Sequence, residues 1–204
     1  MHGPALQVTP GAAPAMLRDY RLRHAGATVL VCGCGPSLLD LPPQPGIVSI
    51  GVNDVGRHFD PDYLVVVNPP QQFRGGRFAH VRASRASALF TQLDLGAVKP
   101  PVVRFRLGQR GGTAVGHGAD DGDVLHYTQN SPYVAVGLAA CMGATRIGLL
   151  GVDFTDHHFF GATGRHPLAG RLAQIDAEYG ALADALAARG VELLNLSPVS
   201  RLTR

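Results

Sequence analysis

The 204-residue chain has no long apolar run and no segment typical of export. Nowhere does it approach the roughly 18 consecutive apolar residues that cross a bilayer. The N-terminal stretch MHGPALQVTPGAAPAML lacks a basic start followed by an apolar block, so it does not predict a secretion signal. We therefore expect a soluble cytoplasmic protein. Its mildly basic composition leaves peripheral contact with an acidic membrane surface open.

Cysteine, lysine and aromatic residues are also scarce. Three cysteines are an odd number, which argues against a disulfide framework, and Cys32 and Cys34 are too close to bridge comfortably. No ligand set follows at zinc spacing, so the cysteines do not predict a zinc site, and we expect no resident metal. The net charge of +3 comes almost entirely from arginine, and Lys99 is the only lysine. Because the basic residues are scattered and do not alternate with aromatics, nucleic acid is not a predicted partner, whereas an anionic small ligand is.

Apolar runs of strand length alternate with helical patterns, which predicts an α/β fold. With 46% hydrophobic residues the chain can form a substantial core. Several runs are apolar on both faces, as is typical of parallel strands covered by helices on each side. We predict one Rossmann-like, doubly wound domain with a mostly parallel sheet over residues 26–204, after an N-terminal extension over 1–25 with a short helix. The predicted strands are 28–33, 46–52, 62–68, 101–107, 146–153 and 191–197, and the predicted helices are 131–143 and 171–189.

The motif GCGPSL at 33–38 follows the first predicted strand and predicts an anion site. Glycines let backbone N–H groups approach a ligand, and a helix beginning at Pro36-Ser37 would aim its N-terminus at a phosphate. The P-loop is excluded because no lysine follows, and the dinucleotide fingerprint is broken because Leu38 stands where a third glycine belongs. A tight turn without a ligand remains the alternative.

Two polar stretches do not fit a strand or a helix. Residues 108–123 are rich in glycine, and residues 155–170 carry three histidines. Long loops in a compact domain are often functional, and both are expected near the carboxyl ends of strands, where such sheets bind ligands. The acidic residues Asp120, Asp121 and Asp123 are expected to form a solvated turn.

The order of motifs along the chain resembles that of a known enzyme family. GCGPSL is followed by VSIGVND, PDYLVVVNP, QNSPYVAVGLAACMGATRIGLLGVDF, a histidine-bearing loop and GVELLNLSPVS. This series resembles the bacterial sialyltransferases that act on lipooligosaccharide and use a CMP-activated sugar. It is also similar to their wider relatives, the Maf-like and 6-hydroxymethylpterin diphosphokinase-like proteins. The resemblance extends over about residues 28–200.

This resemblance implies a nucleotide site at the carboxyl edge of the sheet. The implied contacts come from Gly33, Cys34, Gly35, Pro36, Ser37, Asn53, Asn68, Asn130, Ser131, Gly151, Asp153 and Thr155. Two positions depart from the family: Cys34 replaces an asparagine, and Thr155 replaces a tyrosine that binds the phosphate of the leaving CMP. Tyr127, Tyr133 or an arginine such as Arg165 could replace that tyrosine, or the donor could differ.

The resemblance also implies a metal-independent glycosyltransferase with a histidine as general base and no resident cofactor. The base is expected in the loop before the last long helix, at His166 by order along the chain, with His158 second. The implied partners are a nucleotide-activated sugar and a glycan or small-molecule acceptor, with self-association suggested by the family. Three alternatives stay open: a Mg²⁺-dependent diphosphotransferase, a non-catalytic nucleotide-binding module, and a metal held by Asp153, Asp156, His157, His158 and His166.

Overall fold

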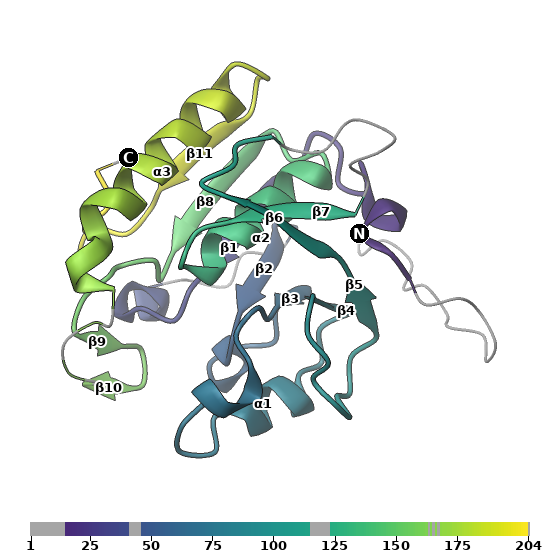
Figure 1. Ribbon diagram of the computed structural model, residues 1–204, viewed down its shortest axis with the longest axis vertical. Helices are drawn as coiled ribbons and strands as arrows, with labels where there is room; N and C mark the ends of the chain where they lie inside the picture. Colours follow the sequence, from purple (N-terminus) through teal and green to yellow (C-terminus); the bar gives the residue numbers. More distant parts are fainter. Residues whose placement is uncertain are drawn as a thin grey trace.

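One seven-stranded sheet organises the molecule (Figure 1). The structure, a computed structural model, describes residues 15–40, 46–114, 123–162, 164, 166 and 168–203. The strands lie in the order β11-β8-β1-β2-β3-β4-β5, and each neighbouring pair is parallel. They are β1 (Thr28–Cys32), β2 (Val48–Val52), β3 (Tyr63–Val65), β4 (Ala88–Thr91), β5 (Val102–Arg104), β8 (Arg146–Leu150) and β11 (Glu192–Asn195).

Helices and two small sheets surround the main sheet. The small sheets pair β6 (Arg106–Arg110) with β7 (Val124–Tyr127) in parallel, and β9 (His157–His158) with β10 (Gly161–Ala162) in an antiparallel hairpin. The α-helices are α1 (Phe78–Ala83), α2 (Ser131–Cys141) and α3 (Leu172–Ala187). Short 3-10 helices are η1 (Leu17–Tyr20), η2 (Pro36–Asp40), η3 (Val55–Arg57), η4 (Pro70–Gln72) and η5 (Ala169–Arg171).

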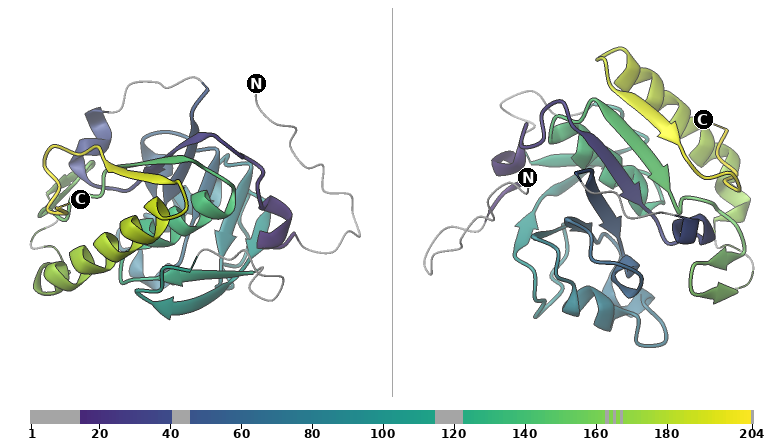
Figure 2. Two further views of the ribbon diagram at one scale, coloured as in Figure 1. Left: turned by 90° about the horizontal axis from the view of Figure 1, so that it is seen from above. Right: turned by 180° about the vertical axis from the view of Figure 1, so that it is seen from behind.

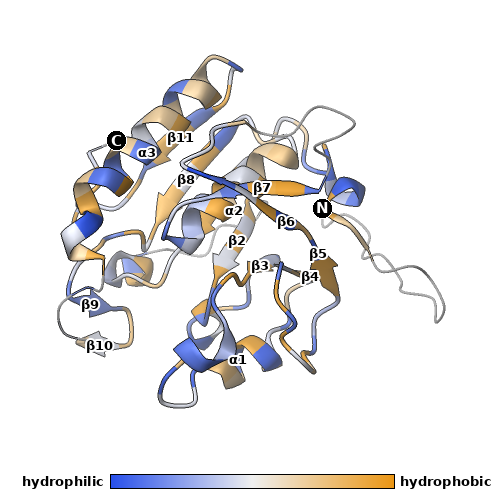
Figure 3. Cartoon of the chain, in the orientation of Figure 1, coloured by the Kyte–Doolittle hydropathy of each residue, from blue (hydrophilic) through white to orange (hydrophobic). Residues whose placement is uncertain are grey.

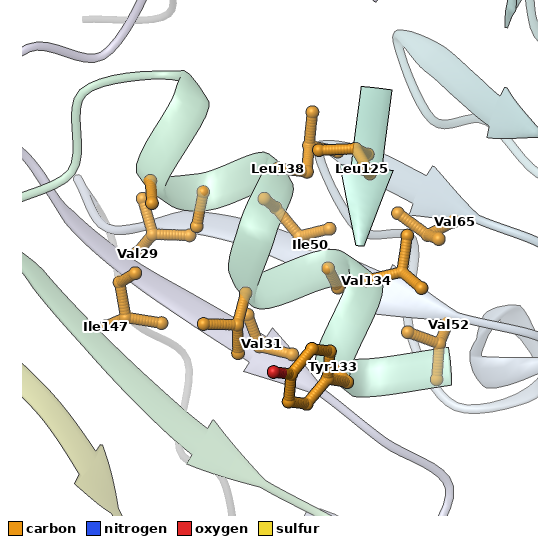
Figure 4. Packing of buried hydrophobic residues seen from close by; sticks show 14 of the residues in the cluster. Val29, Val31, Ile50, Val52, Val65, Leu125, Tyr133, Val134, Leu138 and Ile147 are labelled. Carbon is orange, nitrogen blue, oxygen red and sulfur yellow. The ribbon is translucent and has the colours of Figure 1, made fainter. Parts of the chain in front are cut away.

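The core has two layers because alternate residues of each strand point to opposite faces of the sheet. On one face, α2 packs over β1, β2 and β3, and the buried residues of this layer are drawn in Figure 4 (Val29, Val31, Ile50, Val52, Val65, Tyr133, Val134 and Leu138). On the other face, Leu30, Cys32 and Leu64 pack with Leu38 of η2 and Phe78 of α1. Figure 2 shows α2 and α3 on one side of the sheet and η2 on the other. Figure 3 colours much of the main sheet as hydrophobic, in line with the burial of the strands on both faces.

The chain reverses its direction of sheet building at β1. From β1 it adds β2, β3, β4 and β5 on one side, and it later returns to place β8 and β11 on the other. In open α/β sheets, ligands bind outside the carboxyl ends of the strands at such a reversal. The hairpin β9–β10 lies at this edge (Figure 1).

The α/β class and the mostly parallel sheet predicted from the sequence are confirmed. Local details differ. The helix predicted at Pro36 is a five-residue 3-10 helix, and β4 was not predicted. The glycine-rich stretch from 108 begins inside strand β6. Among the described residues, no helix has the length and apolar character needed to cross a bilayer.

Candidate functional site

The turns that follow β1 and β8 touch each other through their glycines. The Gly33 N–H donates to the carbonyl of Leu150 at 2.7 Å, and the Gly35 N–H donates to the carbonyl of Gly151 at 2.7 Å. A Cβ at Gly35 would lie 2.4 Å from Oδ2 of Asp153, and a Cβ at Gly33 would lie 2.3 Å from the Gly151 carbonyl oxygen. These glycines are therefore required by the close approach of two turns of the protein itself.

Asp153 places its carboxylate at the start of η2. The Ser37 N–H donates to Oδ2 of Asp153 at 2.8 Å, and the Ser37 hydroxyl donates to Oδ1 at 2.7 Å. Both residues are buried, and the Gly151 N–H completes the network by donating to the Ser37 oxygen at 2.9 Å. The groups of the GCGPSL motif that were expected to meet a phosphate thus hold a carboxylate of the protein. Pro36 begins the five-residue η2, which is too short to carry much of a dipole.

Cys34 lies beneath the turn and presents no charge. Its side chain is buried, with Sγ 3.5 Å from the Val52 carbonyl oxygen and 3.9 Å from Oδ1 of Asp54. Burial, with the nearby Asp54 carboxylate, raises the pKa of the Cys34 thiol far above its usual range. The thiol is therefore a neutral packing group.

Three of the predicted polar residues meet at the carboxyl edge. Asn53 follows β2, Asn68 lies just past β3, and Ser131 is the first residue of α2. Nδ2 of Asn68 lies 3.3 Å from Oδ1 of Asn53 and 3.5 Å from the Ser131 hydroxyl, which lies 3.4 Å from the same Oδ1. Asn53 has a φ of +54°, a conformation that asparagine tolerates better than most residues. We call these three residues the Asn/Ser cluster.

The Asn/Ser cluster keeps hydrogen-bonding capacity. Its internal contacts use Oδ1 of Asn53 and Nδ2 of Asn68, whereas within the described residues Nδ2 of Asn53 and Oδ1 of Asn68 make no hydrogen bond. Next to it, Oδ1 of Asn130 accepts a 2.8 Å bond from the Tyr179 hydroxyl. This bond fixes the Asn130 amide and leaves its NH₂ group as the available donor.

The proposed replacements for the missing tyrosine occupy different surroundings. Tyr133 is buried, donates to the Gly112 carbonyl at 3.1 Å, and has its pKa raised to about 12 by burial. Its hydroxyl is thus engaged in packing α2 against the β6–β7 side. The Thr155 hydroxyl donates to the His157 carbonyl at 3.2 Å. Tyr127 lies at the end of β7, and Arg165 lies outside the described residues.

The hairpin β9–β10 carries His158 and docks through a cation–aromatic arrangement that sequence reasoning missed. The Phe159 N–H donates to the Cys34 carbonyl at 3.0 Å. The Phe160 ring stacks with His158 at 5.1 Å and lies 4.1 Å and 4.7 Å from the guanidinium carbons of Arg57 and Arg77. We call these four residues, Arg57, Arg77, His158 and Phe160, the Phe160 cluster. No sequence pattern singles out Arg57 or Arg77, because each belongs to a short loop or a 3-10 helix.

Arg77 is anchored by the fully buried Asp54. Its Nε donates to Oδ2 of Asp54 at 2.7 Å and its Nη2 donates to Oδ1 at 2.5 Å. This two-point pair raises the pKa of Arg77. For His158, burial is the main cause of a lowered pKa, and the charges of Arg77 and His166 add to it. The lowered pKa favours the neutral form of His158 near neutral pH.

His166 lies against Phe154, at a ring separation of 5.4 Å. The backbone N–H of His166 donates to Oδ1 of Asp156 at 3.0 Å. The ring Nδ1 of His166 accepts the backbone N–H of Leu168 at 3.2 Å. Burial lowers its pKa, an effect that Asp156 opposes. With Nδ1 as an acceptor, the neutral ring carries its proton on Nε2. The two candidate histidines lie within electrostatic reach of each other.

Two acidic residues at this edge are paired within the protein, because Asp54 binds Arg77 and Asp153 binds Ser37. Asp123, just before β7, binds Arg18. Asp123 is buried, so the expectation of a solvated turn is wrong for this residue, while Asp120 and Asp121 lie outside the described residues. Over the described ranges, three or more histidine, cysteine or acidic side chains do not gather in a way that could hold a metal ion.

Comparisons with known proteins define the fold class. No protein-family model and no curated protein matches the chain. Among solved structures, the MAf glycosyltransferase from Magnetospirillum magneticum AMB-1 superposes on 95% of this chain, with a TM-score of 0.58 and 15% identity. The chain spans only 40% of the length of that protein.

A second solved structure is similar over much of its own length. The sialyltransferase CstII from Campylobacter jejuni, in complex with cytidine-5'-monophosphate as a substrate analogue, matches 87% of this chain and 83% of its own, with a TM-score of 0.47 and 11% identity. At these identities the comparisons establish the fold alone. The chain has a Rossmann-type α/β fold that a glycosyltransferase also adopts.

Proposed function

We propose that the protein is a glycosyltransferase that moves a sugar from a nucleotide-activated donor to an acceptor hydroxyl. The observation that carries this proposal is the Asn/Ser cluster, where three polar side chains from three elements come within 3.5 Å of one another at the carboxyl edge of the sheet. The fold supports it, since ligands bind at this edge and a glycosyltransferase shares the architecture. The order of motifs along the chain supports a CMP-linked, sialic-acid-like sugar as the donor.

The nucleotide is assigned to the Asn/Ser cluster and Asn130. The amide groups of Asn53, Asn68 and Asn130 suit the ribose and base, because they offer both donors and acceptors. Ser131 opens the eleven-residue α2, so its hydroxyl and N–H suit the phosphate. Gly33, Cys34, Gly35, Pro36, Ser37, Gly151, Asp153 and Thr155 then shape the floor and rim of the site.

The reaction needs a base for the acceptor and hydrogen-bond donors for the leaving group. The acceptor oxygen bonds to the anomeric carbon, the bond from that carbon to the phosphate oxygen breaks, and the nucleoside monophosphate leaves with inversion. His158 is the preferred base because Nδ1 of His166 already accepts the backbone N–H of Leu168, whereas the lowered pKa of His158 favours its neutral form. His166 carries its neutral-state proton on Nε2, which suits a donor to the leaving phosphate. No step requires a metal, because these donors can stabilise the phosphate.

A Mg²⁺-dependent diphosphotransfer would need free carboxylates near the phosphates. Asp54 and Asp153 are instead bound to Arg77 and Ser37. The transferase is therefore the preferred function. A non-catalytic nucleotide-binding module differs from it only in turnover.

A thermal-shift panel of CMP, CDP, UDP, GDP and ATP, with and without Mg²⁺, tests the donor. We expect CMP to raise the melting temperature without metal. Stabilisation by ATP only with Mg²⁺ would replace the proposal with diphosphoryl transfer, and no response to any nucleotide would overturn it.

A charge substitution in the Asn/Ser cluster sharpens this test. Asn68→Asp removes the donor to Asn53 and Ser131 and adds a negative charge beside the phosphate. We expect CMP affinity, measured by calorimetry, to fall by about tenfold or more. The control Gln71→Glu adds the same charge to an exposed side chain three residues away, and its affinity should match the wild type. An equal loss of CMP affinity in both variants would mean that the added charge acts through the overall electrostatic field and that the Asn/Ser cluster does not contact the nucleotide.

A further inference from the structure

We propose that the Phe160 cluster forms a subsite for a negatively charged group on the acceptor, so that the protein glycosylates an acidic sugar or another anionic glycan. This inference rests on the proposed transfer function and adds the chemical class of the second substrate. It is carried by the charge and stacking of Arg57, which the nucleotide site does not use.

The first step of the argument is the charge around the Phe160 ring. Two guanidinium groups lie close to it, those of Arg57 at 4.1 Å and Arg77 at 4.7 Å. The charge of Arg77 is neutralised by the two-point pair with the buried Asp54. Arg57 is exposed and forms no ion pair with any described carboxylate, since the nearby Asp60 binds Arg85 at 3.1 Å. One uncompensated positive charge therefore remains at the ring.

The second step is that Arg57 is held in place before any ligand arrives. A free arginine side chain on a surface loses much of its rotamer freedom when a ligand fixes it. Stacking on Phe160 removes part of this freedom in the unliganded protein. Arg57 is exposed as a residue, so its guanidinium N–H groups can meet a carboxylate or phosphate in a two-point contact.

The third step is the position of the ring relative to the reacting groups. His158, the preferred base, stacks on the same Phe160 ring at 5.1 Å and 26°. Asp54, which holds Arg77, directly follows Asn53 of the Asn/Ser cluster. The hairpin is tied to the β1 turn by the bond from Phe159 N–H to the Cys34 carbonyl. An acceptor that offers its hydroxyl to His158 would place a neighbouring acidic group within the range of Arg57.

The chemistry of the Phe160 cluster suits a sugar that carries a negative charge. A guanidinium beside an aromatic ring and an imidazole suits a ligand with both an apolar face and an anionic group, which is the pattern of a uronic acid, a sialic acid or a sugar phosphate. A carboxylate and a phosphate share this chemistry. The probes below distinguish them.

The test uses matched probes and the full chain. Binding of methyl β-glucuronide and methyl β-glucoside, which differ in one carboxylate, is measured by NMR titration, together with galactose 6-phosphate and galactose. Because a guanidinium–anion contact contributes about 1.4 kcal/mol, we expect the anionic member of at least one pair to bind about tenfold more tightly. The pair that shows the preference identifies a carboxylate or a phosphate.

Three variants assign the preference to Arg57. Arg57→Gln should abolish it, and Arg57→Lys should retain part of it because the charge remains. The control Arg82→Gln removes an exposed arginine whose guanidinium carbon lies 5.2 Å from the ring of Phe78 on α1, and it should keep the full preference. Equal binding of anionic and neutral probes by the wild type, or an undiminished preference in Arg57→Gln, would overturn the proposal.

The two proposals fail in different ways. CMP binding to each variant is measured in parallel, and Arg57→Gln should bind CMP as the wild type does. Intact CMP binding without any anion preference refutes the acceptor subsite alone. Loss of CMP binding in the wild type refutes the donor assignment, while the probe titration, which needs no donor, still decides the subsite.

Discussion

At the scale of single residues, Gly35 has the least room for change. A methyl group there would lie 2.4 Å from Oδ2 of Asp153 and 2.8 Å from the Gly151 carbonyl oxygen, both fixed by buried hydrogen bonds. We predict that Gly35→Ala lowers the free energy of unfolding by about 1–3 kcal/mol, because the two turns must separate. Urea denaturation measures the change.

The control for this prediction is Gly180→Ala in α3, where an added Cβ meets nothing within 4 Å. Alanine favours a helix interior, so this variant should gain up to about 1 kcal/mol. If both substitutions had the same effect, the contact between the two turns would not be the cause of the loss.

The two histidines differ in their expected contributions to turnover. His158→Ala should lower kcat by at least about 100-fold, since a general base contributes that much or more. In the wild type, the acid limb of the pH–rate profile should lie below pH 6.5, because burial lowers the pKa of His158. His166→Ala should retain that limb while losing rate. A variant without His158 but with wild-type kcat would exclude it as the base.

The family resemblance predicted that Asn53, Asn68 and Ser131 lie at one site, and the structure brings them together. Each stands next to the end of a strand or the start of a helix, and such ends meet at one edge of the sheet. The hydrogen bond between the Ser37 hydroxyl and the Asp153 carboxylate could not be predicted from the sequence, because the two residues are 116 positions apart. The preference for His166 rested on order along the chain. The bond from Leu168 N–H to its Nδ1 depends on the local path of the loop, which no spacing reveals.

At the scale of elements, the hairpin β9–β10 depends on the Asp54–Arg77 pair. Asp54 is fully buried, and Arg77 bridges it to Phe160. Breaking a buried ion pair leaves one charge uncompensated. Asp54→Asn should therefore lower the free energy of unfolding by about 3 kcal/mol and expose the hairpin to limited proteolysis.

The exposed pair of Asp60 and Arg85 offers a matched comparison. Solvent screens this pair, so Asp60→Asn should cost less than about 1 kcal/mol and leave hairpin cleavage unchanged. Equal costs would show that burial does not govern the Asp54 effect.

Some elements could be predicted and others could not, for reasons visible in the chain. Strands β1, β2 and β8 are mostly apolar and are followed directly by Gly33, Asn53 and Gly151, a pattern typical of buried parallel strands. Strand β4 follows α1 after a short turn, and because α1 has only six residues no clear helical pattern precedes the strand. The helix predicted to begin at Pro36 is only a five-residue 3-10 helix in the structure. Gly35 and Ser37 are hydrogen-bonded to the turn after β8, and this tertiary contact overrides the local helix propensity.

At the scale of the whole molecule, stability should fall in mild acid. The pKa values of His24, His158 and His166 are lowered below 6.5, in each case mainly by burial. Below about pH 6.5 the unfolded chain therefore binds more protons at these histidines than the folded chain does. Their contribution to stability is fully present above about pH 6.5 and is lost as the pH falls through the lowered values.

Urea denaturation at pH 7.5, 6.5 and 5.5 measures this dependence. The double variant His158→Gln/His166→Gln should show a flatter decline than the wild type, whereas His80→Gln, at an exposed position on α1, should follow the wild type. An identical decline in the double variant would assign the effect to other groups.

The carboxylate of Asp153 has a consequence for competition inside a cell. Orthophosphate and sulfate are abundant small anions that settle into open glycine-rich cradles and would obstruct a donor there. In this chain the Asp153 carboxylate already occupies the turn that follows β1. Because it is covalently part of the chain, its effective concentration there exceeds that of any dissolved salt. Phosphate in the buffer should consequently not inhibit the enzyme by binding at that turn. Any inhibition by salt would instead come from anions that bind at the beginning of α2 or at Arg57.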